Sequence, residues 1–172
     1  MKLALLSDTH DRREVVKKVV AMFPGLGVTH ILHTGDLVSS WMFEILEPDS
    51  YPTWYVFGNN EDQHDEIIET AQNLGITVFL DVGEFELDGK KIACTHYPRV
   101  AESLAAFGSF DLVVHGHSHK KILKKLPTGG YLVNPGTAGG ERGPASFAVY
   151  DTSTHIVEFV DVDVHQKVWS FE

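Results

Sequence analysis

Four short clusters of acidic, amide and histidine side chains recur along the 172-residue chain. Each cluster follows an apolar run that ends in a turn, so each is expected at the end of a strand. The clusters are Asp8-Thr9-His10, Gly35-Asp36, Gly58-Asn59-Asn60-Glu61 and Gly116-His117-Ser118-His119, and a lone His96 precedes the last of them. Carboxylate, amide and imidazole ligands that converge from several loops suit a phosphoryl-transfer site with two divalent metal ions.

A pair of divalent ions that shares a carboxylate would explain why these residue types are present. Such a pair lowers the pKa of a bridging water from 15.7 toward about 7, so that hydroxide can attack phosphorus in line with the leaving oxygen. Neutral imidazoles and amides leave the ions electropositive toward phosphate. Asp8 and His10 are two residues apart, as are His117 and His119, and in extended backbone the members of each pair point the same way.

Apolar runs and helical periodicities alternate along the first half of the chain. The runs predict buried strands at residues 2–7, 29–32 and 53–57. A helix is expected after each of these strands. This β-α-β-α-β-α order predicts a parallel sheet with crossover connections.

Each of the three helices has predicted ends and a predicted buried face. The first is expected to start at Asp11, with Glu14 three residues later, and to stop at Pro24-Gly25. The second follows Ser39-Ser40, and Gly75 closes the third. The side chains expected to face the core are Val15, Val16, Val19, Val20 and Phe23 in the first helix, Trp41, Ile45 and Leu46 in the second, and Ile67, Ile68, Ala71 and Leu74 in the third.

The second half of the chain contains most of the predicted strands. Alternation at Phe85 and Leu87, followed by the turn residues Asp88-Gly89, predicts a hairpin. A helix is expected with Val100, Leu104 and Phe107 on its buried face. The further predicted strands are 91–95, 112–114, 121–126, 131–134, 146–150 and 160–164. The sequence therefore predicts one mixed α/β domain over residues 1–172, with two mixed sheets face to face and helices outside.

The formal net charge of −10 argues against long nucleic acid as a partner, because an acidic surface repels a polyphosphate backbone. A small phosphate ester remains compatible, since two divalent cations would reverse the local field. The basic run Lys120, Lys121, Lys124 and Lys125 is expected to coat a solvent-facing strand, although it could also steer an anion.

Cysteine content and hydropathy suggest where the protein resides. The single Cys94 forms no disulfide within the chain, which fits a reducing compartment, and it is expected to be buried. The apolar stretch at residues 1–6 is too short for a signal peptide, and no stretch approaches membrane-spanning length. A cytoplasmic location without a membrane partner is therefore expected.

The motifs from Asp8 to Arg142 resemble, in content and order, those of the calcineurin-type metallophosphoesterases, and in particular their small bacterial and archaeal phosphodiesterases. The resemblance implies a four-layer αββα sandwich with a dinuclear metal site at the strand ends. The implied ligands are Asp8, His10, Asp36 and His119 for the first metal, and Asp36, Asn59, His96 and His117 for the second. The implied catalytic residues are Asp36, Asn59, Asn60 and His96. Manganese is the expected metal, with iron, zinc, nickel or cobalt as alternatives.

Three positions extend or depart from the family pattern. Many relatives have a histidine where this chain has Asn60, which can bind a phosphate oxygen but cannot supply a proton near neutral pH. Tyr97 follows His96 where relatives often have glycine. Arg142, behind the Asn134-Pro135-Gly136 stretch, would either bind a phosphate oxygen of the substrate or lie exposed in a surface turn.

The remaining acidic residue and histidines are expected either to orient the ligands or to stabilise the fold. Glu61 is expected to orient the site without binding metal, and His33, just before Gly35-Asp36, could do the same. The other histidines outside the ligand pattern are interpreted as structural. They are His30, His64, His155 and His165.

Two functions remain open at this point. The first is metal-dependent hydrolysis of small phosphodiesters, with some action on phosphomonoesters. The second is a protein-binding scaffold, because the superfamily includes a retromer subunit with this fold and little or no catalysis. Competent residues at every ligand position favour the enzyme. The resemblance also favours a homo-oligomer, either a dimer or a tetramer, and the apolar tail at residues 168–171 could contribute a dimer contact.

Overall fold

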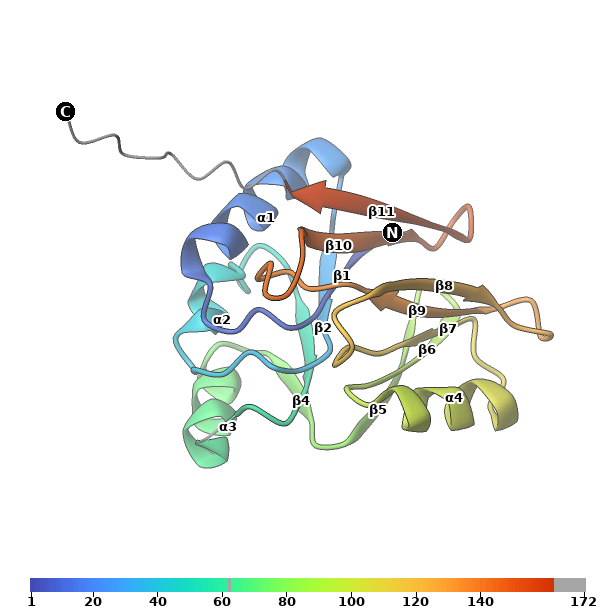
Figure 1. Ribbon diagram of the computed structural model, residues 1–172, viewed down its shortest axis with the longest axis horizontal. Helices are drawn as coiled ribbons and strands as arrows, with labels where there is room; N and C mark the ends of the chain where they lie inside the picture. Colours follow the sequence, from blue (N-terminus) through green and yellow to red (C-terminus); the bar gives the residue numbers. More distant parts are fainter. Residues whose placement is uncertain (62, 163–172) are drawn as a thin grey trace.

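The computed structural model describes residues 1–61 and 63–162 (Figure 1). The helices are Arg13–Leu26 (α1), Met42–Ile45 (α2), His64–Asn73 (α3) and Pro98–Phe107 (α4). The strands are Lys2–Leu6 (β1), His30–His33 (β2), Thr53–Val56 (β3), Thr77–Phe79 (β4), Val82–Leu87 (β5), Lys90–Thr95 (β6), Leu112–Val114 (β7), Lys121–Lys125 (β8), Tyr131–Pro135 (β9), Ala145–Asp151 (β10) and Ile156–Val162 (β11).

The strands form two mixed sheets, as the sequence predicts. The first sheet has the order β11-β10-β1-β2-β3-β4, in which β1 to β4 are parallel and β10 and β11 are antiparallel. The second has the order β5-β6-β7-β9-β8, with β6, β7 and β9 parallel and an antiparallel strand at each edge. The carboxyl ends of the parallel strands carry the polar clusters.

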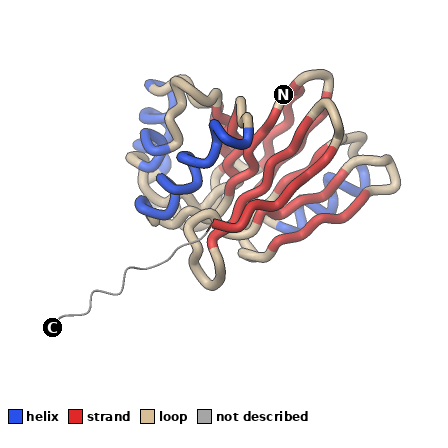
Figure 2. The backbone as a smooth tube through the Cα atoms, turned by 90° about the horizontal axis from the view of Figure 1, so that it is seen from above, coloured by secondary structure: helices blue, strands red, loops and turns tan. Residues whose placement is uncertain are grey.

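Alternating side chains on the strands build a four-layer αββα arrangement. On β1, Leu3 and Leu5 pack into the core between the two sheets, whereas Ala4 and Leu6 pack against the core under α1, α2 and α3. Helix α4 covers the outer face of the second sheet through Ala101 and Ala105. Figure 2 shows helices on both outer sides of the strands.

Both predicted ends of α1 are wrong. The Asp11 carboxylate does not cap the helix, because it accepts hydrogen bonds from the backbone N–H and the hydroxyl of Ser39 at 3.1 and 2.6 Å. At the other end the helix continues through Pro24 to Leu26 and stops at Gly27, whose φ is 70°. A proline in the last turn removes one helical hydrogen bond, and here that loss does not end the helix.

The predicted buried faces of two helices also need correction. Trp41 is 40% exposed, while its neighbours Met42 and Phe43 are buried. On α4, Phe107 is 92% exposed and Val100 is 37% exposed, and the small Ala101 is fully buried instead. A small side chain lets a helix lie close to a sheet, so the size of an apolar residue did not indicate which face is buried.

The remaining predictions about the fold are largely confirmed. The buried face of α3 and the hairpin at Asp88-Gly89 agree with the sequence reading, and Cys94 is buried. The short edge strand β4 was not predicted, because three residues give no readable alternation. The predicted extension of the last strand to 164, the tail at 168–171 and His165 lie outside the described residues. Within the described part of the chain, no helix has the length and apolar character needed to cross a membrane.

Candidate metal centre

The predicted ligands lie in loops at the carboxyl ends of parallel strands. Asp8 and His10 follow β1, Asp36 follows β2 and Asn59 follows β3, all in the first sheet. His96, His117 and His119 follow β6 and β7 of the second sheet. Because both sheets direct these ends to one side, residues that are more than a hundred positions apart meet there.

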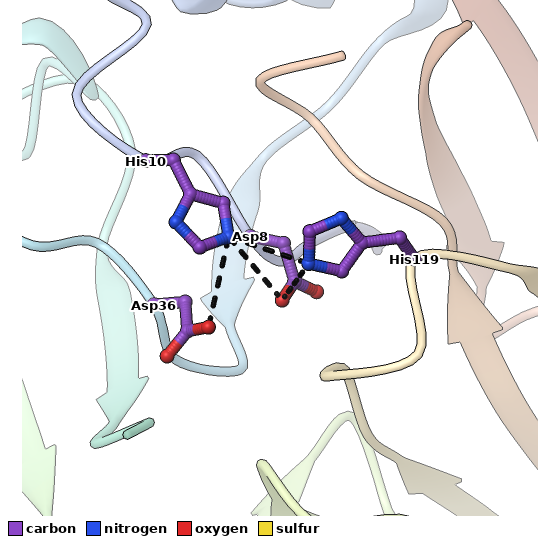
Figure 3. Close-up of side chains that lie close together, drawn as sticks. All are labelled: Asp8, His10, Asp36 and His119. Carbon is purple, nitrogen blue, oxygen red and sulfur yellow. Dashed lines mark hydrogen bonds and ion pairs between the residues drawn. The ribbon is translucent and has the colours of Figure 1, made fainter. Parts of the chain in front are cut away.

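Four side chains form the first ligand group, which consists of Asp8, His10, Asp36 and His119. One nitrogen or oxygen atom from each lies within 4.8 Å of the others. His119 Nε2 lies 3.1 Å from Asp8 Oδ1 and 3.3 Å from His10 Nε2, and the latter lies 3.6 Å from Asp36 Oδ2. Figure 3 shows the four side chains pointing toward one another. The structure thus brings the predicted first-metal residues together.

The second ligand group consists of Asp36, Asn59, His96 and His117. Asn59 Oδ1 lies 2.8 Å from His117 Nδ1 and 3.1 Å from His96 Nε2. The same His96 nitrogen lies 3.4 Å from Asp36 Oδ1. Asp36 therefore faces the first group with one oxygen and the second group with the other, which is the arrangement that a shared carboxylate requires.

The backbone at these ligands is left-handed, whereas extended backbone was predicted. Extended backbone therefore does not explain why the side chains of each pair point toward the site. The residues with positive φ are Asp8 at 55°, His10 at 45°, Asp36 at 56°, His117 at 67° and His119 at 56°. Such conformations are costly for residues other than glycine and concentrate at functional sites. Backbone hydrogen bonds from Asp8 to Gly35 (3.0 Å) and from His10 to Asp36 (3.1 Å) hold the two loops together.

Two of the imidazoles are oriented by backbone carbonyl groups. His96 Nδ1 lies 2.7 Å from the carbonyl oxygen of Thr34, and His119 Nδ1 lies 3.1 Å from that of Glu141. A carbonyl oxygen can only accept, so each Nδ1 carries the proton. Nε2 of each ring then faces the ligand groups, and it is the nitrogen that a metal would bind in this orientation.

The two carboxylates have opposite pKa shifts. Burial raises the pKa of Asp8 above its ordinary value of 3.8, against the opposing effect of a hydrogen bond from Ser7. Burial acts in the same direction on Asp36, but the nearby His96 and the hydrogen bond from Asn60 outweigh it, so the pKa of Asp36 is lowered. A carboxylate whose ionised form is favoured, and which lies between two groups of nitrogen and oxygen donors, is well suited to bind cations.

One buried oxygen in the first group lacks a hydrogen-bond partner. Asp8 Oδ1 is buried and accepts no hydrogen bond within the described residues. An unpaired buried carboxylate oxygen is costly, and a cation would satisfy it. The donors in both groups are oxygen and nitrogen atoms without a thiolate, which suits divalent ions such as manganese, iron or zinc. The residues present therefore fit a metal site.

Asn60 and Arg142, the predicted substrate-binding residues, lie in different surroundings. The Asn60 side chain lies beside Asp36 and donates to its Oδ2 atom at 2.6 Å. Arg142 is exposed, and among the described residues no hydrogen bond or ion pair joins it to either ligand group. The adjacent Glu141 reaches the site instead, with its Oε2 atom 3.3 Å from His10 Nε2.

Glu61 and Asn134 hold the loops that carry the ligands. The buried Glu61 carboxylate accepts from the backbone N–H groups of Leu37 (2.8 Å) and Gly58 (3.0 Å) and from the hydroxyl of Tyr55 (2.6 Å). Asn134 Nδ2 donates to the carbonyl oxygen of Gly116 at 2.8 Å. Glu61 thus has the orienting position expected of it, whereas the loop-holding role of Asn134 was not predicted.

Histidines outside the ligand pattern contact neighbours away from the ligand atoms. His33 is buried and lies 3.1 Å from the Thr9 hydroxyl, so it supports the loop between Asp8 and His10. His155 contacts the Tyr150 hydroxyl at 2.8 Å. His115 also lies outside the ligand pattern, and its Nδ1 lies 3.1 Å from the carbonyl oxygen of Gly116.

Comparison with known proteins places these features in a family. Residues 1–155 match the calcineurin-like phosphoesterase superfamily domain. The chain is 26% identical over 156 residues to phosphodiesterase MJ0936 of Methanocaldococcus jannaschii, which covers 88% of this chain and 93% of that protein.

Solved structures agree in fold. A structure described as a novel archaeal phosphodiesterase has a TM-score of 0.86 and 24% identity, and the match covers 94% of this chain and all of that one. The phosphoesterase YfcE of E. coli has a TM-score of 0.69 and 20% identity, with 95% and 100% covered. Vps29 of Entamoeba histolytica in complex with zinc has a TM-score of 0.66 and 16% identity, with 94% and 99% covered. Taken together with the two ligand groups, the domain match establishes that the chain belongs to the calcineurin-like phosphoesterase superfamily.

Proposed function

We propose that this protein is a metal-dependent phosphodiesterase that hydrolyses small phosphodiesters at a pair of divalent metal ions. The observation that carries the proposal is the position of Asp36, whose two oxygens face two separate groups of nitrogen and oxygen donors. Membership of a phosphoesterase superfamily and the similarity to a phosphodiesterase support the reaction class.

Two sets of side chains would hold the two ions. Asp8, His10 and His119 would hold one ion, Asn59, His96 and His117 the other, and Asp36 would bind both. When bound, two such ions would attract phosphate oxygens and lower the pKa of a water molecule toward about 7. The carbonyl oxygens of Thr34 and Glu141 keep the rings of His96 and His119 in the ligating tautomer.

Asn60 would give the leaving group little help. Asn60 stands where many relatives have histidine, and its amide cannot give up a proton near neutral pH. Its hydrogen bond to Asp36 instead keeps that carboxylate in place. We therefore expect diesters whose leaving group is already a weak base, such as aryl esters, to be the better substrates.

Manganese is the proposed metal, and the alternatives are iron, zinc, nickel and cobalt. The donor set contains imidazole, carboxylate and amide groups, which several divalent ions accept. Affinity alone does not choose among them, because metal supply in the cell contributes to the outcome. Equilibrium dialysis of the purified protein against each ion would measure which one it retains.

Hydrolysis of bis(p-nitrophenyl) phosphate by the full chain tests the proposal. Metal-depleted protein should be inactive, and added Mn²⁺ should restore turnover. The turnover rate of Asp36→Asn should be at least about a hundredfold lower than that of the wild type, because the substitution removes the shared negative charge. Glu158→Gln, an exposed change on β11, serves as the matched control and should keep wild-type activity.

The alternative is a protein-binding scaffold of the same fold. The likeness to Vps29 extends to the fold alone, because the identity is 16%. All seven ligand positions of this chain carry residues that can bind metal, which favours the enzyme. A sample that binds Mn²⁺ fully and still shows no turnover would contradict the enzymatic proposal and favour the scaffold.

A further inference from the structure

The side chain of Glu141 borders the first ligand group from the loop between β9 and β10. Its Oε2 lies 3.3 Å from His10 Nε2, the nitrogen that also faces Asp36 Oδ2 at 3.6 Å and His119 Nε2 at 3.3 Å. The Glu141 side chain is 43% exposed, so its carboxylate has room to rotate beside His10.

The backbone of Glu141 is held against the loop that carries Asp8 and His10. Its carbonyl oxygen accepts from His119 Nδ1 at 3.1 Å. Two residues earlier, the backbone N–H of Gly139 donates to the carbonyl oxygen of Asp8 at 3.1 Å, and the Thr137 hydroxyl donates to the same oxygen at 2.9 Å. The position of Glu141 at the site therefore follows from the packing of this loop.

The charges around the first ligand group call for a cation. Asp8, Asp36 and Glu141 place carboxylate oxygens 3.8, 3.6 and 3.3 Å from His10 Nε2. In residues 1–61 and 63–162, no lysine or arginine forms an ion pair with any of the three. Asp8 Oδ1, which is fully buried, also has no hydrogen-bond partner there. A buried, unpaired oxygen beside uncompensated carboxylates is an independent indication that a cation binds at this point.

We propose that the Glu141 carboxylate is a further ligand of the metal ion held by Asp8, His10, Asp36 and His119. This inference rests on the metal binding that the proposed function requires. Two divalent ions bring four positive charges, and Asp8 with Asp36 brings two negative ones. With the bound water still neutral, Glu141 lowers the remaining charge from +2 to +1. The site would bind its metal more tightly and would match a singly charged phosphodiester better than a doubly charged monoester.

Calorimetric titration of the metal-free full chain with Mn²⁺ alone tests the proposal without any activity measurement. Glu141→Gln should weaken one of the two Mn²⁺ sites by at least about tenfold, the lower limit seen when residues that support a metal ligand are replaced. Glu141→Asp, which keeps the charge on a shorter side chain, should recover part of the affinity. Glu84→Gln, an exposed change on β5, is the matched control and should bind like the wild type.

Thermal unfolding separates a ligand from a structural residue. Without metal, Glu141→Gln should unfold at the wild-type temperature or slightly above it, because it removes a like charge beside Asp8 and Asp36. With Mn²⁺ present, its Tm should rise less than that of the wild type, since a weaker ligand stabilises less. Equal Mn²⁺ affinities for Glu141→Gln and the wild type, or a lower metal-free Tm, would overturn the ligand assignment and leave the proposed function intact. A wild type without Mn²⁺ uptake would overturn both.

Discussion

The side-chain amide of Asn60 donates a 2.6 Å hydrogen bond to Asp36 Oδ2, and the backbone N–H of Asn60 donates to Asp36 Oδ1 at 3.1 Å. One residue thus contacts both oxygens of the carboxylate that faces the two ligand groups. The sequence suggested that Asn60 binds a phosphate oxygen of the substrate. Its contacts indicate a second role, which is to fix the direction of Asp36.

Asn60→Ala should weaken Mn²⁺ binding by roughly ten- to a hundredfold, because the residues that orient a metal ligand contribute about that much to affinity. The backbone contact would remain, so the variant should still fold. Mn²⁺ titration of the metal-free protein would measure the change. Asn73→Ala, an exposed position at the end of α3, is the control, and equal affinities for the two variants would argue against the orienting role.

Asn60→His should change how strongly the rate depends on the leaving group. A histidine can protonate a departing alkoxide, and such acid catalysis contributes about 10²–10⁴-fold. We expect the wild type to cleave aryl diesters much faster than alkyl diesters, and Asn60→His to narrow that ratio by roughly tenfold or more. Rates for a series of diesters with increasing leaving-group pKa would provide the measurement. Equal rates of the wild type on aryl and alkyl esters would contradict the expectation.

Glu61→Ala should destabilise the protein by about 3 kcal/mol or more, because it leaves three donors without their acceptor. These are the N–H groups of Leu37 and Gly58 and the hydroxyl of Tyr55. Tyr55→Phe removes only one of the three contacts and should cost about 1–2 kcal/mol. Urea denaturation of both variants would give the free energies of unfolding. A smaller loss of unfolding free energy for Glu61→Ala than for Tyr55→Phe would contradict this role of Glu61.

Gly35→Ala should disturb both stability and metal binding. Gly35 has a φ of 90°, and a Cβ atom there would lie 2.7 Å from His96 Nδ1 and from the backbone nitrogen of Gly58. The expected cost is about 1–3 kcal/mol from backbone strain, together with a displaced His96 ring. Gly25→Ala is the matched control, since nothing lies within 4 Å of its added Cβ and the site is helical. The control should be neutral or stabilising by up to about 1 kcal/mol.

His33 should make the metal-free protein less stable in acid. Burial lowers the pKa of His33 in the folded protein from 6.5 to about 3. Between these values the unfolded chain binds a proton that the folded protein excludes, so stability falls as the pH drops from 6.5 toward 3. His33 thereby lowers the free energy of unfolding by about 1.4 kcal/mol for each pH unit in this range. His33→Gln keeps a partner for Thr9 and should reduce the slope of unfolding free energy against pH by that amount. A variant with the wild-type slope would contradict the assignment.

The sequence by itself indicated that the strands of the first half are parallel, and it predicted which residues would bind metal. Both depend on local information, because an apolar run predicts its own strand and a cluster such as Asp8-Thr9-His10 carries its ligand types with it. Once the strands are parallel, their carboxyl ends must meet at one edge. The convergence of Asp8 with Asp36, which follow neighbouring strands of the first sheet, could therefore be expected. His119 follows a strand of the second sheet, so it reaches them only through the packing of the two sheets.

The tertiary structure alone decided the features that depend on residues far apart in the chain. The left-handed backbone at Asp8 is held by a hydrogen bond to Gly35, and the buried face of α4 depends on how closely Ala101 approaches the second sheet. Glu141 entered the site and Arg142 did not, although the two are neighbours in the sequence. Loop packing against Asp8 and His119 sets that difference, and no periodicity in the sequence reports contacts of that kind.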